Sequence, residues 1–293
     1  MKFTTSYIKT GMAGLVFVAL AASCKKDGNP NDLPAVDPGQ YEGTIDGFHS
    51  SDEVFPEDLV AYWSFDDTKN EIKTGTAPTS SVNDSYVTDA VRGKALSLAA
   101  GYLYYATQFD AFKTDNLKNW SLSAWVKLKN NGSKRTMVFQ MARPGVFNGN
   151  INFALNTQSY PATNDSVLRI QPTFSTVGGG TQDNLNNVLD KTDLNEWVHI
   201  VLTYDFATGV FNNWMNGVKV GNFPNRGVGN NSFKSYEPSE VFFGANYNAA
   251  GMPVNADVNF APMTGLLDEV RIYDRTLPDA FIKALYNLGL ANK

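Results

Sequence analysis

Acidic side chains are the residues of this chain whose types and spacing come nearest to supporting a reaction or a metal site. They include two adjacent pairs at expected strand ends, Asp66-Asp67 and Asp268-Glu269. Hydrolysis of a glycosidic bond needs two carboxyl groups that face each other across the bond, about 5 to 9.5 Å apart. Neighbouring residues of a strand point to opposite faces of a sheet, so neither pair provides that arrangement by itself. A pair drawn from different strands stays compatible with the sequence.

Other catalytic patterns are absent from the sequence. There is no Gly-x-Ser-x-Gly turn and no nucleotide-binding glycine fingerprint, and the glycines at 178–180 lie between strand signals, which indicates a loop. His199 is the only histidine after the expected N-terminal tether, which excludes a zinc site built from several histidines. The only cysteine, Cys24, belongs to the N-terminal region, so the domain has no thiol for a disulfide or a metal.

Asp268 lies in a strand-like stretch from Gly265 to Asp279. Alternation predicts that it shares the buried face with Leu266, Val270 and Ile272, while Glu269, Arg271 and Tyr273 share the other face. Burial in a low-dielectric environment favours the neutral form of a carboxyl group. We therefore expect a cation or several hydrogen-bond donors beside Asp268.

Several loops combine aromatic and amide side chains, the types from which sandwich proteins build sugar sites. Aromatic faces stack on a pyranose ring, and amides hydrogen-bond its hydroxyl groups. The stretch 222–262 is longer than two strands need and holds four prolines, which favours it as a ligand surface. The candidate ligand-binding residues are Asn148, Tyr236, Asn246 and Tyr247. The alternative is that the asparagines serve turn geometry and the tyrosines pack over the sandwich edge.

A β-rich scaffold must position these residues. Roughly a dozen short segments of strand-like pattern are separated by turn residues, Trp120 to Leu128 being the clearest, and Asn216-Gly217 predicts a type I′ hairpin. The stretch between Asp67 and Gly93 is polar, and we expect it to be a loop. A helical period appears only in the last fifteen residues. The pattern predicts an all-β, two-sheet antiparallel sandwich with a short C-terminal helix.

The N-terminal residues predict export and anchoring. Residues 1–23 combine two lysines, an apolar run and small residues before Cys24, which looks like a bacterial lipoprotein signal peptide. Cys24 would then be the lipidation site; the alternative is a general export signal in which Cys24 is incidental. Residues 24–57 lack periodicity and predict a flexible tether, and residues 58–293 form the expected domain. We expect an outer-membrane lipoprotein of the cell envelope, periplasmic or surface-exposed.

The charge of the chain limits its partners. Loss of residues 1–23, which hold two lysines and no acid, takes the formal net charge from −5 to −7. A moderately acidic surface argues against nucleic acid and against direct binding to anionic lipid. The expected partners are a carbohydrate or a cell-surface protein, with the membrane contacted only through the lipid anchor.

Six segments, in their order and spacing, resemble the laminin-G-like branch of the concanavalin A-like lectin/glucanase superfamily. They read LVAYWSFDD, RGKAL, WSLSAWVK, EWVHIVLTYD, MNGV and GLLDEVRIYDRTL. The resemblance covers about Leu59 to Leu288. It implies a jelly roll of two curved sheets, commonly with one structural Ca²⁺ ion at the rim, which binds carbohydrates or proteins and is sometimes fused to enzymes.

The resemblance also implies roles for particular residues. The first and last strands of such a sandwich lie side by side and antiparallel, which would bring Asp66 close to Asp268 and suit calcium, with backbone carbonyls completing six to eight oxygens. The alternative is a turn cap at Asp66 and backbone amide donors at Asp268, without a metal. His199 matches a histidine that is part of the sheet in the family, which implies a structural imidazole. Glucanases of this fold carry a Glu-x-Asp-x-Glu segment, which this sequence lacks.

We therefore expect a non-catalytic carbohydrate-binding module that captures glycans at the outer membrane, with no catalytic residues. One alternative is a protein-interaction or adhesion domain, which a flat concave sheet poor in aromatic residues would favour. The other is a glycoside hydrolase or lyase, which would need a deep groove with two facing acids. The fold by itself does not decide between them.

Overall fold

The structure is a computed structural model that describes residues 43–130, 135–157, 165–186, 190–191, 193–255 and 259–293. Residues 43–293 form one of the chain's two units. The other unit, with the predicted signal peptide, Cys24 and most of the predicted tether, lies outside the described residues. Within the described part, no helix has the length and apolar character needed to cross a membrane.

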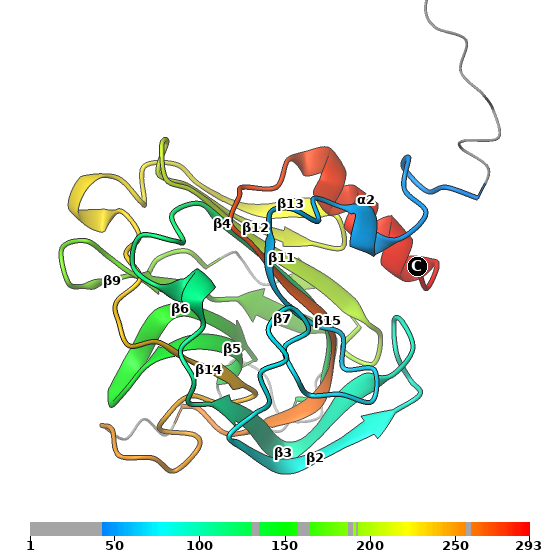
Figure 1. The fold of residues 1–293 in the computed structure, drawn as a ribbon, viewed down its shortest axis with the longest axis horizontal. Helices are drawn as coiled ribbons and strands as arrows, with labels where there is room; N and C mark the ends of the chain where they lie inside the picture. Colours follow the sequence, from blue (N-terminus) through cyan, green and yellow to red (C-terminus); the bar gives the residue numbers. More distant parts are fainter. Residues whose placement is uncertain (1–42, 131–134, 158–164, 187–189, 192, 256–258) are drawn as a thin grey trace, which may run out of the picture. The chain divides into compact units, whose positions relative to one another are not determined.

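Strands dominate the described unit (Figure 1). Along the chain they are β1 (Leu59–Trp63), β2 (Ser80–Val87), β3 (Ala95–Tyr105), β4 (Trp120–Leu128), β5 (Arg135–Arg143), β6 (Val146–Asn156), β7 (Val167–Ile170), β8 (Thr173–Ser175), β9 (Thr181–Gln182), β10 (Asp190–Lys191), β11 (Val198–Asp205), β12 (Val210–Met215), β13 (Val218–Phe223), β14 (Glu240–Phe243) and β15 (Met263–Tyr273). The helices are the 3-10 turns η2 (Ser51–Glu53), η3 (Asp110–Phe112) and η4 (Gly229–Asn231) and the α-helix α2 (Asp279–Leu290).

The strands form one curled antiparallel sheet in the order β10-β7-β6-β5-β14-β3-β15-β4-β11-β12-β13. β1 also pairs with β15, β2 with β3, and β8 with both β6 and β9. The main core takes side chains from β3, β5, β6 and β14 in one half of the sheet and from β1, β4, β11 and β15 in the other. The predicted all-β jelly-roll fold is confirmed, with the two expected sheets continuous through long strands such as β3 and β15.

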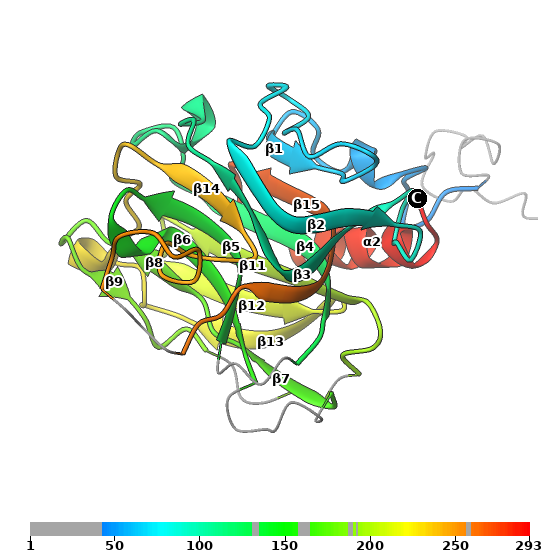
Figure 2. The ribbon, with the colours of Figure 1, turned by 90° about the horizontal axis from the view of Figure 1, so that it is seen from below.

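The helix α2 explains why β4 is buried on both faces. Leu122, Ala124 and Val126 of β4 join the core, whereas Trp125 points to the other face and stacks on Tyr286 of α2, with ring centroids 5.7 Å apart. Figure 2 shows α2 at the end of the unit that also holds the first described residues. The helix therefore serves as a cover for the outer face of the central strands.

The segment 43–58, which we call the N-terminal clasp, packs beside α2. Val54 is only 1% exposed, and the rings of Phe48 and Phe55 lie 5.9 and 4.4 Å from that of Phe281. The assignment of residues 43–57 to the flexible tether was therefore wrong, and the structural domain begins at Gly43. The apolar residues of the clasp follow no regular period, because they contact a helix through turns and not as a strand.

The stretch between Asp67 and Gly93 is not all loop, because it contains β2. This strand pairs with β3 from Ser80 opposite Tyr104 to Val87 opposite Ala95. Among the described strands it pairs with β3 alone, and its side chains are half-buried or exposed, so it carries little apolar alternation. Backbone pairing with a long neighbour stabilises a strand that its own side chains do not indicate.

The predicted faces of the last strand were wrong on one side of Glu269. Glu269 has a positive φ of 52°, and the β15–β4 register shifts between Asp268 and Arg271. Because of the bulge, both residues before Val270, Asp268 and Glu269, point outward. Leu267, and not Leu266, therefore joins Val270 in the core. Asp268 consequently lies on the outer face of the sheet, where it is nevertheless fully buried.

Candidate functional site

A surface pocket of about 560 Å³ opens between the β5–β6 hairpin, the β8–β9 hairpin and residues 253–255. We call it the loop pocket. Its lining includes Arg143, Phe147, Asn148, Thr181, Val254 and Asn255. In both views these hairpins lie at the end of the unit opposite the N-terminal clasp (Figures 1 and 2). Asn148, a predicted ligand-binding residue, is thus placed in a pocket of a size suited to a small ligand.

The β5–β6 hairpin is built to hold its residues in one place. Pro144-Gly145 is a two-residue turn with Gly145 at φ 66°, and Gly149 packs so closely that a Cβ atom would lie 2.3 Å from the carbonyl oxygen of Met141. Below the turn, the buried Oδ1 atom of Asn152 accepts hydrogen bonds from Gln140 Nε2 at 2.7 Å and from the Gly149 amide at 2.9 Å. The hairpin is therefore anchored by hydrogen bonds between buried amide groups.

The polar side chains of the loop pocket form no hydrogen bond or ion pair with the part of the chain that the structure describes. Those of Arg143, Asn148, Thr181 and Asn255 make no hydrogen bond or ion pair with the described residues. The half-buried ring of Phe147 leans on Phe260, with centroids 5.5 Å apart and planes at 73°. The pocket thus presents one aromatic surface among unoccupied donors and acceptors, which is chemistry suited to a polyhydroxylated ligand.

Tyr236 lies behind the loop pocket and not in its lining. Its backbone N–H donates to Asn150 Oδ1 at 3.0 Å, its carbonyl accepts from Asn150 Nδ2 at 2.8 Å, and its hydroxyl donates to the Thr176 carbonyl at 2.7 Å. The guanidinium of Arg143 lies 4.4 Å from its ring centroid, and Lys234 Nζ lies 4.8 Å from it. Tyr236 therefore supports Arg143, a pocket residue that the sequence analysis missed.

Asn246 and Tyr247 are structural, so their prediction as ligand-binding residues was wrong. Asn246 is 0% exposed, and its Oδ1 atom accepts the Ala249 amide at 2.9 Å. Tyr247 is 6% exposed; its ring packs on Phe242 at 5.2 Å, and its hydroxyl donates to Glu240. The alternative of turn geometry and edge packing describes both residues correctly.

The predicted metal residues, Asp66 and Asp268, meet at one loop. β1 and β15 pair antiparallel, as the family resemblance implied. Asp66 Oδ1 accepts the Lys94 amide at 2.7 Å, and Asp268 Oδ2 accepts the amides of Val91 and Arg92 at 2.8 and 3.0 Å. The loop 91–94 thus donates backbone hydrogen bonds to both carboxyl groups. Backbone amide donors at Asp268 are what the alternative without a metal expects.

The second oxygen of Asp268 decides whether these residues suit a cation. Burial first, and the charge of Glu269 second, raise the pKa of Asp268 to about 8, and the charge of Asp66 adds to the effect. Asp268 Oδ1 is buried and has no hydrogen-bond partner among the described residues. A Ca²⁺ ion would give that oxygen a partner and neutralise the repulsion, so the two carboxyl groups fit one. Clusters of three or more metal-ligating side chains are absent from the described residues, so backbone oxygens would complete the shell.

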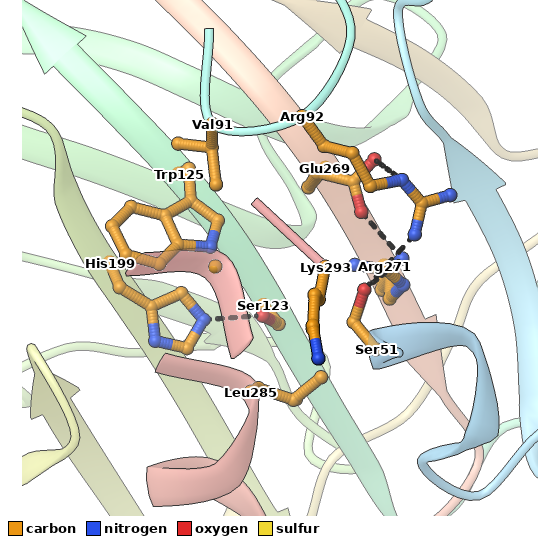
Figure 3. Close-up of a pocket in the computed structure, with 11 residues that line it drawn as sticks. Ser51, Val91, Arg92, Ser123, Trp125, His199, Glu269, Arg271, Leu285 and Lys293 are labelled. Atoms are coloured by element: carbon orange, nitrogen blue, oxygen red, sulfur yellow. Dashed lines mark hydrogen bonds and ion pairs between the residues drawn. The ribbon is translucent and has the colours of Figure 1, made fainter. Parts of the chain in front are cut away.

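A buried polar cluster lies beneath α2 and the N-terminal clasp (Figure 3). Arg271 bonds Glu269 at 2.5 Å and Asp52 at 2.9 Å, and Arg92 bonds Asp52 at 3.0 Å. The Ser51 hydroxyl accepts from Arg271 at 3.1 Å, which joins the clasp to β15. The enclosed cavity has only about 10 Å³, room for about one water molecule, so the cluster holds the fold together and binds no sugar.

His199 belongs to the same cluster. Its Nε2 atom lies 2.8 Å from the Ser123 hydroxyl, but the two residues are only 1% and 2% exposed (Figure 3). Its Nδ1 atom has no partner among the described residues, whereas a nucleophilic Ser–His pair needs an acid there and a path for substrate. Burial first and the charge of Arg271 second lower the pKa of His199 to about 3, which keeps the imidazole neutral. The structural role predicted for His199 is confirmed.

Known structures share this fold. Domain 4 of AbnA, a GH43 extracellular arabinanase from Geobacillus stearothermophilus solved with arabinotriose, is similar at a TM-score of 0.51 and 18% identity, over 78% of this chain and 98% of that one. The ligand-binding domain of botulinum neurotoxin serotype D, solved with N-acetylneuraminic acid, is similar at 0.50 and 12% identity, over 82% and 52%. The binding domain of Paraclostridial Mosquitocidal Protein 1 is similar at 0.51 and 13% identity, over 79% and 52%, so this chain spans about half of both toxin domains.

No curated protein matches the sequence. At these identities the solved structures establish the fold alone. A laminin G family model, described as the concanavalin A-like lectin/glucanases superfamily, matches residues 101–283. The match spans more than half of the chain and agrees with the curled antiparallel sheet. The chain therefore belongs to the concanavalin A-like lectin/glucanase superfamily.

Proposed function

We propose that this protein is a non-catalytic carbohydrate-binding module that captures a glycan in the loop pocket. The observation that carries the proposal is the ring of Phe147 set among amide, hydroxyl and guanidinium groups that form no hydrogen bond or ion pair with the described residues. Family membership supports it. Two of the similar structures support it as well, because one was solved with arabinotriose and the other with N-acetylneuraminic acid. The stacking surface and the hydrogen-bonding groups are the two components that sugar recognition requires.

The composition of the loop pocket favours binding over hydrolysis. Among the described residues that line it there is no aspartate or glutamate. Hydrolysis of a glycosidic bond by the usual mechanism needs two carboxyl groups at the bond. A sugar held in this pocket would meet donors and an aromatic face, and so would be bound without being cleaved.

We further propose that the protein acts in the cell envelope as an outer-membrane lipoprotein held by Cys24. The pattern of residues 1–24 supports this proposal. The described unit begins at the end opposite the loop pocket (Figures 1 and 2). An N-terminal lipid anchor would therefore leave the pocket accessible to glycans.

We also propose one structural Ca²⁺ ion, held by Asp66 and Asp268 with backbone oxygens. The unpartnered, buried Oδ1 atom of Asp268 supports it. The ion would neutralise the carboxylates of Asp66, just after β1, and Asp268, in the middle of β15, and fix the loop 91–94 that both of them bind. Its contribution would be to stability and not to sugar contact, because these residues do not line the loop pocket.

A glycan array probed with the purified protein tests the proposed function, in calcium and again in EDTA. Phe147→Ala and Asn148→Ala should each weaken binding about tenfold, because each removes one stacking or hydrogen-bonding contact. The matched controls are Phe206→Ala, at an exposed ring elsewhere, and Asn70→Ala, at an exposed amide. If the folded protein binds no glycan on the array, the proposal is overturned and protein partners become the candidates to test.

A further inference from the structure

Arg143 is a cation without a counterion in the lining of the loop pocket. No described residue forms a hydrogen bond or an ion pair with its guanidinium. Other cations of the described unit do have carboxylate partners, for example Arg271, Arg275 and Lys127 at 2.5 to 2.8 Å. The charge at the pocket is therefore available to a ligand.

Two acids that lie close to Tyr236 and Arg143 in sequence or in strand pairing are engaged elsewhere. Glu237 accepts hydrogen bonds from Gln108 Nε2 and the Thr114 amide, both at 3.1 Å. Glu240 accepts the hydroxyl groups of Tyr104 and Tyr247. Neither carboxylate is paired with Arg143, and no other described residue forms an ion pair with it.

The guanidinium is held in place before any ligand arrives. It lies over the ring of Tyr236, and Tyr236 is itself fixed through both its backbone polar groups and its hydroxyl. A cation–π contact consumes no hydrogen-bond acceptor, so the guanidinium N–H groups remain free to donate. Lys234, on the same ring, adds a second positive charge nearby. Preorganisation of this kind reduces the entropy lost when a ligand binds.

We propose that the loop pocket selects acidic saccharides, with Arg143 binding the sugar carboxylate. The inference rests on the proposed function and names the class of glycan. The planar fork of an arginine matches a carboxylate with two parallel hydrogen bonds, and the ring of Phe147 and the amides of Asn148 and Asn255 are placed to contact the rest of the sugar. The net charge of −5 repels anions in general, so selection depends on this local site.

The test compares glycans that end in glucuronate, galacturonate or N-acetylneuraminate with their methyl esters, which keep the sugar and remove the charge. Wild type should bind at least one acid about 10- to 100-fold more tightly than its ester, the value of a charge-assisted hydrogen-bond pair. Arg143→Gln should abolish that preference, and Arg143→Lys should restore part of it. Arg226→Gln, at an exposed arginine outside the pocket, is the matched control and should change nothing.

The outcomes separate the two proposals. Equal binding of acids and esters, or an acid preference that survives in Arg143→Gln, would overturn this inference and leave the carbohydrate-binding function in place. A folded protein that binds neither these glycans nor the neutral ones of the array would overturn the proposed function and this inference with it. Circular dichroism and the thermal midpoint of each variant establish that it is folded.

Discussion

Replacing Asp268 by asparagine should change how the stability of the protein depends on pH. Burial and the charge of Glu269 raise the pKa of Asp268 to about 8, from 3.8 for an exposed aspartate. Between these values the native state binds a proton that the unfolded state has released. The free energy of unfolding therefore falls as the pH rises, by about 1.4 kcal/mol per pH unit from this group.

His199 contributes the opposite slope in the lower part of the range. Its pKa is lowered to about 3, from 6.5, so between these values the unfolded state binds the extra proton and stability rises with pH. The two slopes oppose each other from about pH 4 to pH 6.5 and Asp268 acts alone from there to about pH 8, which gives a loss of about 2 kcal/mol. Asp268→Asn should remove that loss. The free energy of unfolding of the variant should then rise with pH from about pH 4 to pH 6.5, because only the contribution of His199 remains.

Urea titrations in EDTA, at closely spaced pH values from about 4 to 8.5, measure these free energies. Asp115→Asn, at an exposed carboxylate, is the control and should keep the wild-type profile. A wild type whose stability is flat from pH 6.5 to 8, together with a variant that is much less stable at pH 7, would refute the reasoning. Calcium should raise the stability and cancel the loss above pH 6.5, because a bound ion keeps the carboxylate charged. No effect of calcium would count against the proposed metal site.

Two further substitutions test the packing around these carboxylates. Gly93→Ala would place a Cβ atom 1.8 Å from Asp66 Oδ1, whereas Gly75→Ala, at a similar positive φ, meets open space. We expect the first to destabilise the protein by at least about 1 kcal/mol more than the second in urea, and equal losses would contradict a tight Asp66–loop contact. Arg271→Met leaves Glu269 buried without its 2.5 Å partner and should cost about 3–5 kcal/mol. Adding Glu269→Gln should recover part of that loss, and a loss below about 1 kcal/mol for Arg271→Met alone would show that the ion pair matters little.

Local sequence patterns predicted the strands and turns that depend on neighbouring residues. Trp120 to Leu128 is a strand with the predicted bounds, and Asn216 and Gly217 both adopt the positive φ, 51° and 74°, that a type I′ turn requires. The antiparallel approach of Asp66 and Asp268 followed from the family resemblance. Each of these features is set by residue types within a few positions or by a topology that the whole family shares.

What the sequence did not predict depends on contacts between distant segments. The bulge at Glu269 moves Asp268 to the outer face, although the alternation of apolar residues on either side of it looks regular. Asn246 and Tyr247 have the composition of a sugar site, but the segment that carries them folds onto the sheet and buries both side chains. Arg143 gave no signal of its own, because its role arises from Tyr236, some ninety residues later, and from a pocket shared by three loops.

The position of β15 has a consequence for the order in which the chain can fold during synthesis. This strand comes almost last in the sequence, yet it lies between β3 and β4 and also pairs with β1. Until the ribosome has released Met263–Tyr273, the two halves of the sheet have no strand to join them, and both β3 and β4 expose an unpaired edge. The domain therefore cannot complete its sheet before Met263–Tyr273 has been synthesised. The contacts that complete it span roughly 140 to 210 residues, and a product truncated before Met263 cannot form the native sheet.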